Sequence, residues 1–380
     1  MRRMFSRYNK VFMSTIGLAI ALCGAMNAVV DPYGLWRLGE IRRFNAAKVE
    51  QVNHEFLFKA VDLERMSPQV LFIGSSRVLV GLDPRLPVWG PDSSAYNLGL
   101  TGGHLPTLLG YLEHALYNNS RVHTVVIGVD FFMFSQSMIA PEGFRADRLM
   151  RTSVPLFDLR DTLLSADALK ASLTTIKSNY SQPDFMPYDA WGAATAVHLA
   201  RISARDGMQK RFAESIDLYA NDPQRFKGFR FSEARMEDFK AMLRLCRNKG
   251  LAVHVFLPPE HAILLQIMFG RGLWPEYEHW LRLMAEITSY WDFGGYNSVT
   301  TEPVAWTMQY YWDISHYRKN VGDMVLSRIT GYDQLQVPPD FGTFVTRDSV
   351  ERLIDLQRAQ HQQWATAHPD LVAWVDKAAR

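Results

Sequence analysis

The sequence predicts a doubly wound α/β domain with a central parallel sheet, a transmembrane helix before it and a helical insertion within it. Short apolar runs that mostly end at Gly or Pro alternate with stretches of helical periodicity. A 20-residue stretch without a charge lies near the N-terminus, which is the length a helix needs to cross a bilayer. Residues 135–231 contain no clear strand pattern, which indicates an insertion.

The composition excludes several classes of protein. The chain has 380 residues, of which 48% are hydrophobic and 21% charged, so it is not a disordered protein. Its net charge of +2 leaves no basic excess to neutralise phosphates, and we expect no binding to nucleic acid. Two cysteines, Cys23 and Cys246, exclude a disulfide scaffold and a Cys-rich zinc site.

Four apolar runs are the predicted strands. They cover residues 69–73, 95–98, 124–129 and 251–257. Their apolar character is continuous rather than alternating, which is typical of parallel strands buried on both faces. Residues 106–117 and 232–249 have helical spacing, and the second run places Phe239, Met242, Leu243 and Cys246 on one side.

These patterns predict four parts. Residues 1–30 form a cytoplasmic tip and an anchor, residues 31–66 a connector, and residues 67–330 the α/β domain. Its insertion at about 135–231 is expected to cap the strand ends. Residues 331–380 are expected to form a helical appendage, with an amphipathic run at 349–364.

The apolar stretch at 11–30 predicts a signal anchor. Four basic residues precede it, namely Arg2, Arg3, Arg7 and Lys10. The positive-inside rule keeps this end in the cytoplasm and exports the rest of the chain. A cleaved signal peptide is the alternative, but the apolar stretch is long for one and no small-x-small site follows it closely.

Three segments carry the candidate chemistry. Gly74-Ser75-Ser76 follows the first strand, where a serine can be presented at the start of a helix beside free backbone N–H groups. Taken alone, this turn is also what an ordinary helix cap looks like. Asp313 and His316 are three residues apart, so the carboxylate can orient the imidazole as a general base, although a local surface pair has the same spacing.

A glycine-rich segment, residues 97–104, follows the second strand and suits close approach of the backbone to a bound group. A mobile loop is the alternative for this segment. A serine after the first strand, a glycine loop after the second and a distal Asp-x-x-His together describe a serine hydrolase or acyltransferase.

In these motifs the chain resembles the SGNH (GDSL-like) family, over about residues 69–257 without the insertion, and over residues 313–329. It looks most similar to the membrane-anchored branch that includes the teichoic acid D-alanine transfer protein and the alginate O-acetylation proteins. The resemblance implies a flavodoxin-like three-layer sandwich. It also implies that Ser76 is the nucleophile, that Asp313 and His316 complete a triad, and that the N–H groups of Ser76 and Gly102 form the oxyanion hole.

The sequence departs from the family pattern after the third strand. The family usually has Gly-x-Asn-Asp there, whereas this chain has Gly128-Val129-Asp130, so one oxyanion donor is absent or comes from elsewhere. Four residues near these motifs are predicted to contact substrate: Arg77, Asn97, His104 and Asp130. A salt bridge under the turn is the alternative for Arg77, and a helix N-cap is the alternative for Asp130.

The predicted function is O-acyl transfer, most simply of acetyl, to an exported polysaccharide or another glycan of the cell envelope. The alternatives are an esterase that removes acyl groups and a non-catalytic scaffold or glycan-binding subunit. Localisation in a bacterial inner membrane, with one span and a periplasmic domain, and a multispanning O-acyltransferase as partner follow from the resemblance. No cofactor is expected, and no metal site, because His254 and His261 lack a third ligand nearby.

Overall fold

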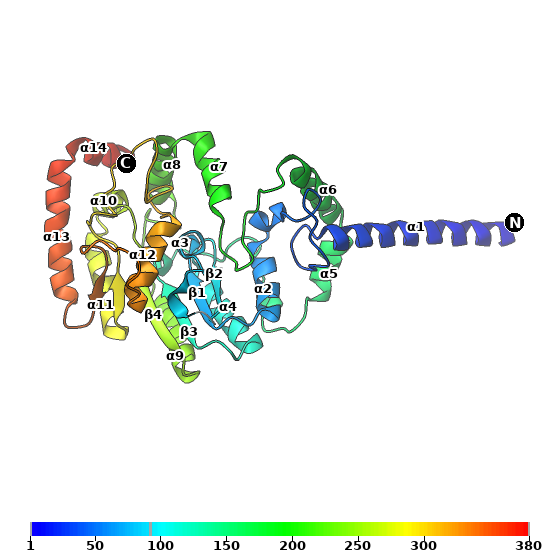
Figure 1. Cartoon of the computed structure of the whole chain (residues 1–380), viewed down its shortest axis with the longest axis horizontal. Coiled ribbons are helices and arrows are strands. Elements are labelled where there is room, and N and C mark those ends of the chain that lie inside the picture. The colour runs from blue at the N-terminus through cyan, green and yellow to red at the C-terminus, as the bar shows by residue number, and fades with distance from the viewer. Residues whose placement is uncertain (1, 91–92, 379–380) are drawn as a thin grey trace.

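We describe the protein from a computed structural model, which places residues 2–90 and 93–378 (Figure 1). The strands are β1 (Val70–Gly74), β2 (Ala95–Gly99), β3 (Thr124–Gly128), β4 (Ala252–Leu257), β5 (Tyr290–Asp292) and β6 (Thr343–Val345). The helices of the first half are α1 (Arg2–Val30), α2 (Glu55–Arg65), α3 (Ser76–Gly81), α4 (Leu105–Asn118), α5 (Leu156–Leu163), α6 (Ala166–Ser181) and α7 (Ala196–Asp206). Those of the second half are α8 (Met208–Asn221), α9 (Glu233–Asn248), α10 (Ala262–Gly270), α11 (Trp274–Ile287), α12 (Lys319–Thr330), α13 (Val350–Ala367) and α14 (Pro369–Ala378). Short 3-10 helices are η1 (Val49–Asn53), η2 (Pro87–Trp89), η3 (Phe131–Phe134) and η4 (Ala146–Arg148).

The strands form one mixed sheet in the order β2-β1-β3-β4-β5-β6. The first five strands in this order are parallel, and β6 pairs antiparallel with β5 at the edge. Every residue of β1, β2 and β3 is buried, as the continuous apolar runs predict. The four predicted strands and the α/β class are therefore confirmed.

Helices connect the parallel strands and pack against them. α4 and α9 contact each other, α4 contacts β1, and α9 contacts β4. The apolar face predicted for α9 is buried, including Phe239 and Cys246. α3 contacts both β1 and β2, and α12 packs on α3. The prediction missed β5, because a strand of three residues carries too little pattern to recognise.

The N-terminal helix projects from the rest of the molecule (Figure 1). Its segment Phe5–Val30 is long and apolar enough to span a membrane or to serve as a signal anchor. Each residue from Phe5 to Leu22 is exposed, whereas the last turns of α1 pack against α5 and α6.

Two predicted parts differ from the structure in their arrangement. The insertion at 135–231 does not form one cap over the strand ends, because α5 and α6 pack on α1 while α8 packs on α10. The buried face of α6 is small and polar, with Ala168, Ala171 and Ser172, and fits a helix rather than an apolar sheet. The C-terminal appendage is not purely helical, since it contributes β6 to the sheet before α13 begins.

Candidate active site

Ser76 lies where the chain turns from β1 into α3. Ser75 is the N-cap of α3, and its hydroxyl accepts a hydrogen bond from the Arg77 N–H at 3.2 Å. A Cβ on Gly74 would lie 2.7 Å from the carbonyl oxygen of Gly128, so only glycine fits between the neighbouring strands. Ser76 is thereby held at the first position of a helix, partly exposed to solvent.

The structure brings Ser76, His316 and Asp313 into one hydrogen-bonded chain. Ser76 Oγ lies 2.8 Å from Nε2 of His316, although the two residues are 240 positions apart. Nδ1 of the same ring lies 2.8 Å from Oδ2 and 3.0 Å from Oδ1 of Asp313. Because an ionised carboxylate only accepts, the Nδ1 atom carries the hydrogen and Nε2 is free to accept the serine proton.

Asp313 is buried and stays ionised. Burial alone would raise its pKa, but the charge and hydrogen bond of His316 hold this pKa well below its usual range, together with the backbone N–H groups of Ser315 and His316. Both N–H groups donate to Oδ1 at 2.8 Å. The arrangement orients the carboxylate before any substrate arrives.

Arg211 is a contact of Asp313 that the sequence did not indicate. It lies in α8, and its Nη2 donates to Asp313 Oδ2 at 3.1 Å while its Nε donates to the carbonyl of Trp312 at 3.0 Å. The segment from 135 to 231 showed no motif around this arginine, so only the packing of α8 could reveal it.

The glycine loop after β2 lies beside the turn that carries Ser75 and Ser76. Gly102 and Gly103 have φ of +90° and +65°, conformations that side chains rarely adopt. A Cβ on Gly103 would lie 3.0 Å from Cβ of Ser75, so the loop approaches this turn closely. Within the described residues the N–H groups of Ser76 and Gly102 have no acceptor, which leaves both free to bind an oxyanion.

Helix α2 holds this loop in place. Glu55 is buried and accepts hydrogen bonds from the Thr101 N–H at 2.6 Å and the Thr101 hydroxyl at 3.1 Å. Lys59, fully buried, donates to the carbonyls of Asn97 and Gly99. The connector after the anchor thus contributes the support of the glycine loop.

Arg77 does not contact substrate, because its side chain has no exposed surface. It forms buried ion pairs with Asp130 and Glu260 and donates through Nε to Ser315 Oγ at 3.1 Å. Burial raises the pKa of Glu260 to about 7, with Asp130 adding to the effect and Arg77 opposing it. Arg77 therefore ties the nucleophile helix to the loop that carries Asp313 and His316.

Two further substrate contacts were predicted wrongly. Asn97 is fully buried, and its amide donates to the carbonyls of Val78 and Leu82 at 2.8 and 2.9 Å, which closes the end of α3. Asp130 is buried in the Arg77 ion pair at the start of η3. His104 is largely buried, with Nδ1 2.9 Å from Thr107 Oγ1, and its contact with a substrate stays a prediction.

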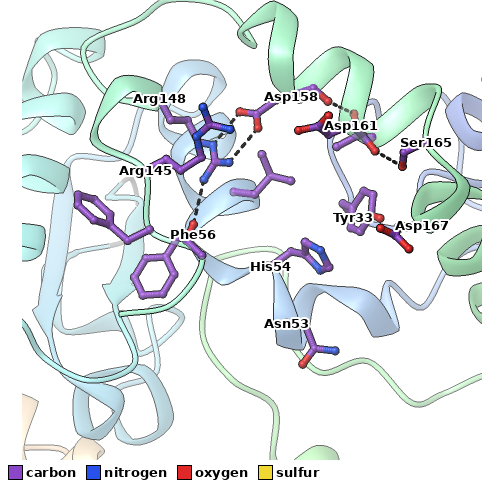
Figure 2. Close-up of a pocket in the computed structure, with 14 residues that line it drawn as sticks. Tyr33, Asn53, His54, Phe56, Arg145, Arg148, Asp158, Asp161, Ser165 and Asp167 are labelled. Atoms are coloured by element: carbon purple, nitrogen blue, oxygen red, sulfur yellow. Dashed lines mark hydrogen bonds and ion pairs between the residues drawn. The ribbon is translucent and has the colours of Figure 1, made fainter. Parts of the chain in front are cut away.

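One cavity of the structure lies away from this site. It has a volume of about 610 Å³ between α2 and α5 and is lined by residues such as His54, Phe56 and Asp158 (Figure 2). Neither Ser76 nor His316 lines it. Arg148 forms an ion pair with Asp158 through two hydrogen bonds, of 2.7 and 2.8 Å. This cavity therefore lies where α2 and η4 meet the helices α5 and α6 that pack on α1.

A smaller cavity of about 230 Å³ shares elements with the catalytic candidates. It is lined by Val80 of α3, Leu199 of α7, and Trp312 and Lys319 on either side of the Asp313–His316 segment. Its walls combine an aromatic ring with a cation. Among residues 2–90 and 93–378, no group of three or more His, Cys, Asp or Glu side chains could hold a metal ion.

Comparisons with known proteins leave the family open. No protein-family model matches the chain, and no curated protein gives a significant match. Among solved structures, one from Streptococcus pneumonia that is provisionally described as a platelet activating factor aligns with a TM-score of 0.31 and 11% identity. The alignment covers 74% of this chain and 96% of that one. At this TM-score the likeness carries no argument about fold or activity.

Proposed function

We propose that the protein is a membrane-anchored, extracytoplasmic O-acyltransferase of the SGNH type that transfers an acyl group, most simply acetyl, to an exported glycan. The observation that carries the proposal is the hydrogen-bonded chain Ser76–His316–Asp313, with bonds of 2.8 Å on each side of the ring. Surface Asp–His pairs are common, but a serine hydroxyl on the other ring nitrogen is what nucleophilic catalysis requires.

The sheet supports the same assignment. The order β2-β1-β3-β4-β5 with parallel strands is that of a flavodoxin-like domain, in which sites form beyond the carboxyl ends of the strands. Ser76 follows β1 and the glycine loop follows β2, so both candidate groups lie at that edge. The three-layer arrangement remains part of the proposal.

The reaction proceeds through an acyl-enzyme. Ser76 Oγ attacks the acyl carbonyl of the donor, its proton passes to Nε2 of His316, and the N–H groups of Ser76 and Gly102 stabilise the oxyanion. The donor group leaves with the proton from His316. A glycan hydroxyl then attacks the acyl-serine and gives its proton to Nε2, which returns it to Ser76 as the ester forms.

The location of the site favours transfer at a membrane. The α1 helix would tether the domain to the extracytoplasmic face, within reach of an acyl donor delivered by a multispanning membrane protein. An esterase is the second candidate, because Ser76 is partly exposed and the His316 side chain is 27% exposed, so water can reach an acyl-enzyme.

Covalent labelling tests the proposal. Full-length protein in detergent is treated with a fluorophosphonate, and its intact mass is compared with that of Ser76→Ala and of Ser75→Ala. We expect one adduct in the wild type and in Ser75→Ala, and none in Ser76→Ala. Absence of an adduct in folded wild-type protein would reject the activated serine and favour the scaffold alternative.

Glycan analysis separates the two enzymatic candidates. In cells that lack the protein, the acyl content of the exported glycan should fall for a transferase and rise for an esterase. Complementation with the wild type should restore the original content, and complementation with Ser76→Ala should not.

A further inference from the structure

The last turns of α1 pack against two helices of the insertion. α5 and α6 both contact α1, and we call residues 156–181, which include these two helices and Leu164 between them, the collar. Asn27, fully buried, donates to the carbonyl of Leu163 at 2.8 Å and accepts from the hydroxyl of Ser172 at 2.8 Å. These bonds join the collar and α1 into one unit.

The free part of α1 is too short to cross a bilayer by itself. Lys10 marks the charged end, and the twelve exposed residues from Val11 to Leu22 extend about 18 Å at roughly 1.5 Å per residue. The hydrocarbon core of a bilayer is about 30 Å thick. Even a count from Arg7 gives only about 24 Å, at the same rise per residue. The uncharged stretch reaches the full thickness only if its last turns, with the collar around them, also lie at bilayer depth.

The surface of the collar suits that depth. A Cβ on Gly24 of α1 would lie 3.1 Å from a methyl carbon of Leu164, so Leu164 sits at the level of the apolar stretch, and it is 52% exposed. On α6, Leu173 is 55% exposed and lies between the exposed Lys170 and Lys177, at spacings of three and four residues. Exposed leucine and lysine side chains are compatible with the interface of a membrane that contains anionic lipids.

We propose that the collar is a lipid-binding surface that inserts into the outer leaflet around α1, with Leu164 and Leu173 among the acyl chains and Lys170 and Lys177 at anionic headgroups. This inference rests on the membrane anchor of the proposed function. It does not require that the site be catalytic. It would also fix the tilt of the sheet domain on the membrane, because the collar and α1 are bonded to each other.

Site-directed spin labelling of the full chain tests this inference. Single cysteines replace Leu164 or Leu173 in a Cys23→Ala, Cys246→Ala background, and each protein is reconstituted into vesicles of phosphatidylcholine and phosphatidylglycerol. Leu356→Cys on α13 is the matched control, because Leu356 is equally exposed at 48% and lies at the other end of the molecule (Figure 1). Ile16→Cys reports on α1 itself. Thermal melts confirm that each labelled protein is folded.

We expect collisions with oxygen, relative to those with a water-soluble nickel complex, to be several-fold more frequent at positions 164 and 173 than at 356. Aqueous behaviour at 164 and 173 with a lipid-exposed label at 16 would overturn the collar but preserve the anchor. An aqueous label at 16 as well would reject the anchor. Spin–spin broadening at 164 would show that a second copy covers the collar, which also contradicts lipid binding.

Discussion

The collar and the edge of the sheet around Ser76 both bury polar side chains, but they expose opposite kinds of surface. Between α1 and the collar, the buried Asn27 accepts a hydrogen bond from Ser172 and donates one to the Leu163 carbonyl, whereas Leu164 and Leu173 are exposed. At the sheet edge, apolar side chains fill the interior around the Arg77 ion pairs, while Ser76 and His316 remain partly exposed. Under the two proposals above, the collar would contact lipid, whereas the site around Ser76 would meet a polar substrate.

The largest expected effect is at the Asp313 carboxylate. Asp313→Asn replaces one of the two carboxylate oxygens beside His316 Nδ1 by an amide NH₂, which favours the wrong His316 tautomer, and we expect fluorophosphonate labelling of Ser76 to slow by about 10⁴-fold. Asp83→Asn, which changes an aspartate paired with Arg85 instead, is the control and should label at the wild-type rate. Equal rates in the two variants would contradict the triad.

The buried ion pairs behind Ser76 come next. Arg77→Met leaves Asp130 and Glu260 without their cation, which should lower the free energy of unfolding by about 3–5 kcal/mol in a denaturant titration. Arg225→Met is a matched control, because the Arg77 and Arg225 guanidinium groups both lie over the Phe132 ring, at 5.3 and 4.4 Å. Within the described residues Arg225 has no ion pair to either carboxylate. A similar loss in both variants would mean that the stacking on Phe132, and not the ion pairs, stabilises the site.

At the contact between α1 and the collar, Asn27→Leu removes the hydrogen bonds of Asn27 to the Leu163 carbonyl and the Ser172 hydroxyl. We expect a loss of about 1–3 kcal/mol, confined to this end of the molecule, because the Leu163 carbonyl and the Ser172 hydroxyl lose their partner. Hydrogen exchange in detergent should speed up in α6 and stay unchanged in β1. The double variant Asn27→Leu, Ser172→Ala should recover part of the lost stability. If neither change alters the hydrogen-exchange protection of α6, these hydrogen bonds do not hold α1 and the collar together.

The smallest expected effect is the pH dependence of stability that comes from Asp292, a second buried carboxylate of the sheet domain. Burial raises the pKa of Asp292 to about 6, in contrast to Asp313. The folded state then binds a proton more tightly than the unfolded chain, so this group lowers the stability as pH rises from 5 to 8, by about 1 kcal/mol. The difference in free energy of unfolding between Asp292→Asn and the wild type should therefore shift in favour of the variant by that amount between pH 5 and pH 8. Urea unfolding at the two pH values measures this shift. A difference that does not vary with pH would show that the group does not titrate in this range.

Local patterns were sufficient for the longer strands and for α9, but not for the short strands or for the contacts between distant elements. The apolar runs of β1 to β4 and the periodicity of α9 appear in short windows of sequence. β5 and β6 are three residues each and show no such pattern. The contact between Arg211 of α8 and Asp313 could not be predicted for a different reason. No sequence motif around Arg211 indicates that it pairs with Asp313.

The sequence by itself determined that the protein has a long apolar helix at its start, an α/β body, and a serine, an aspartate and a histidine in suggestive local settings. These features depend on neighbours within a few residues, where hydrophobic periodicity and turn chemistry act. Only the tertiary structure decided that Ser76 meets His316 across 240 positions, and that Arg77 and Asn97 turn inward to ion pairs and helix carbonyls. Burial and pairing of this kind follow from the order of the strands and the packing of the insertion, which no single segment encodes.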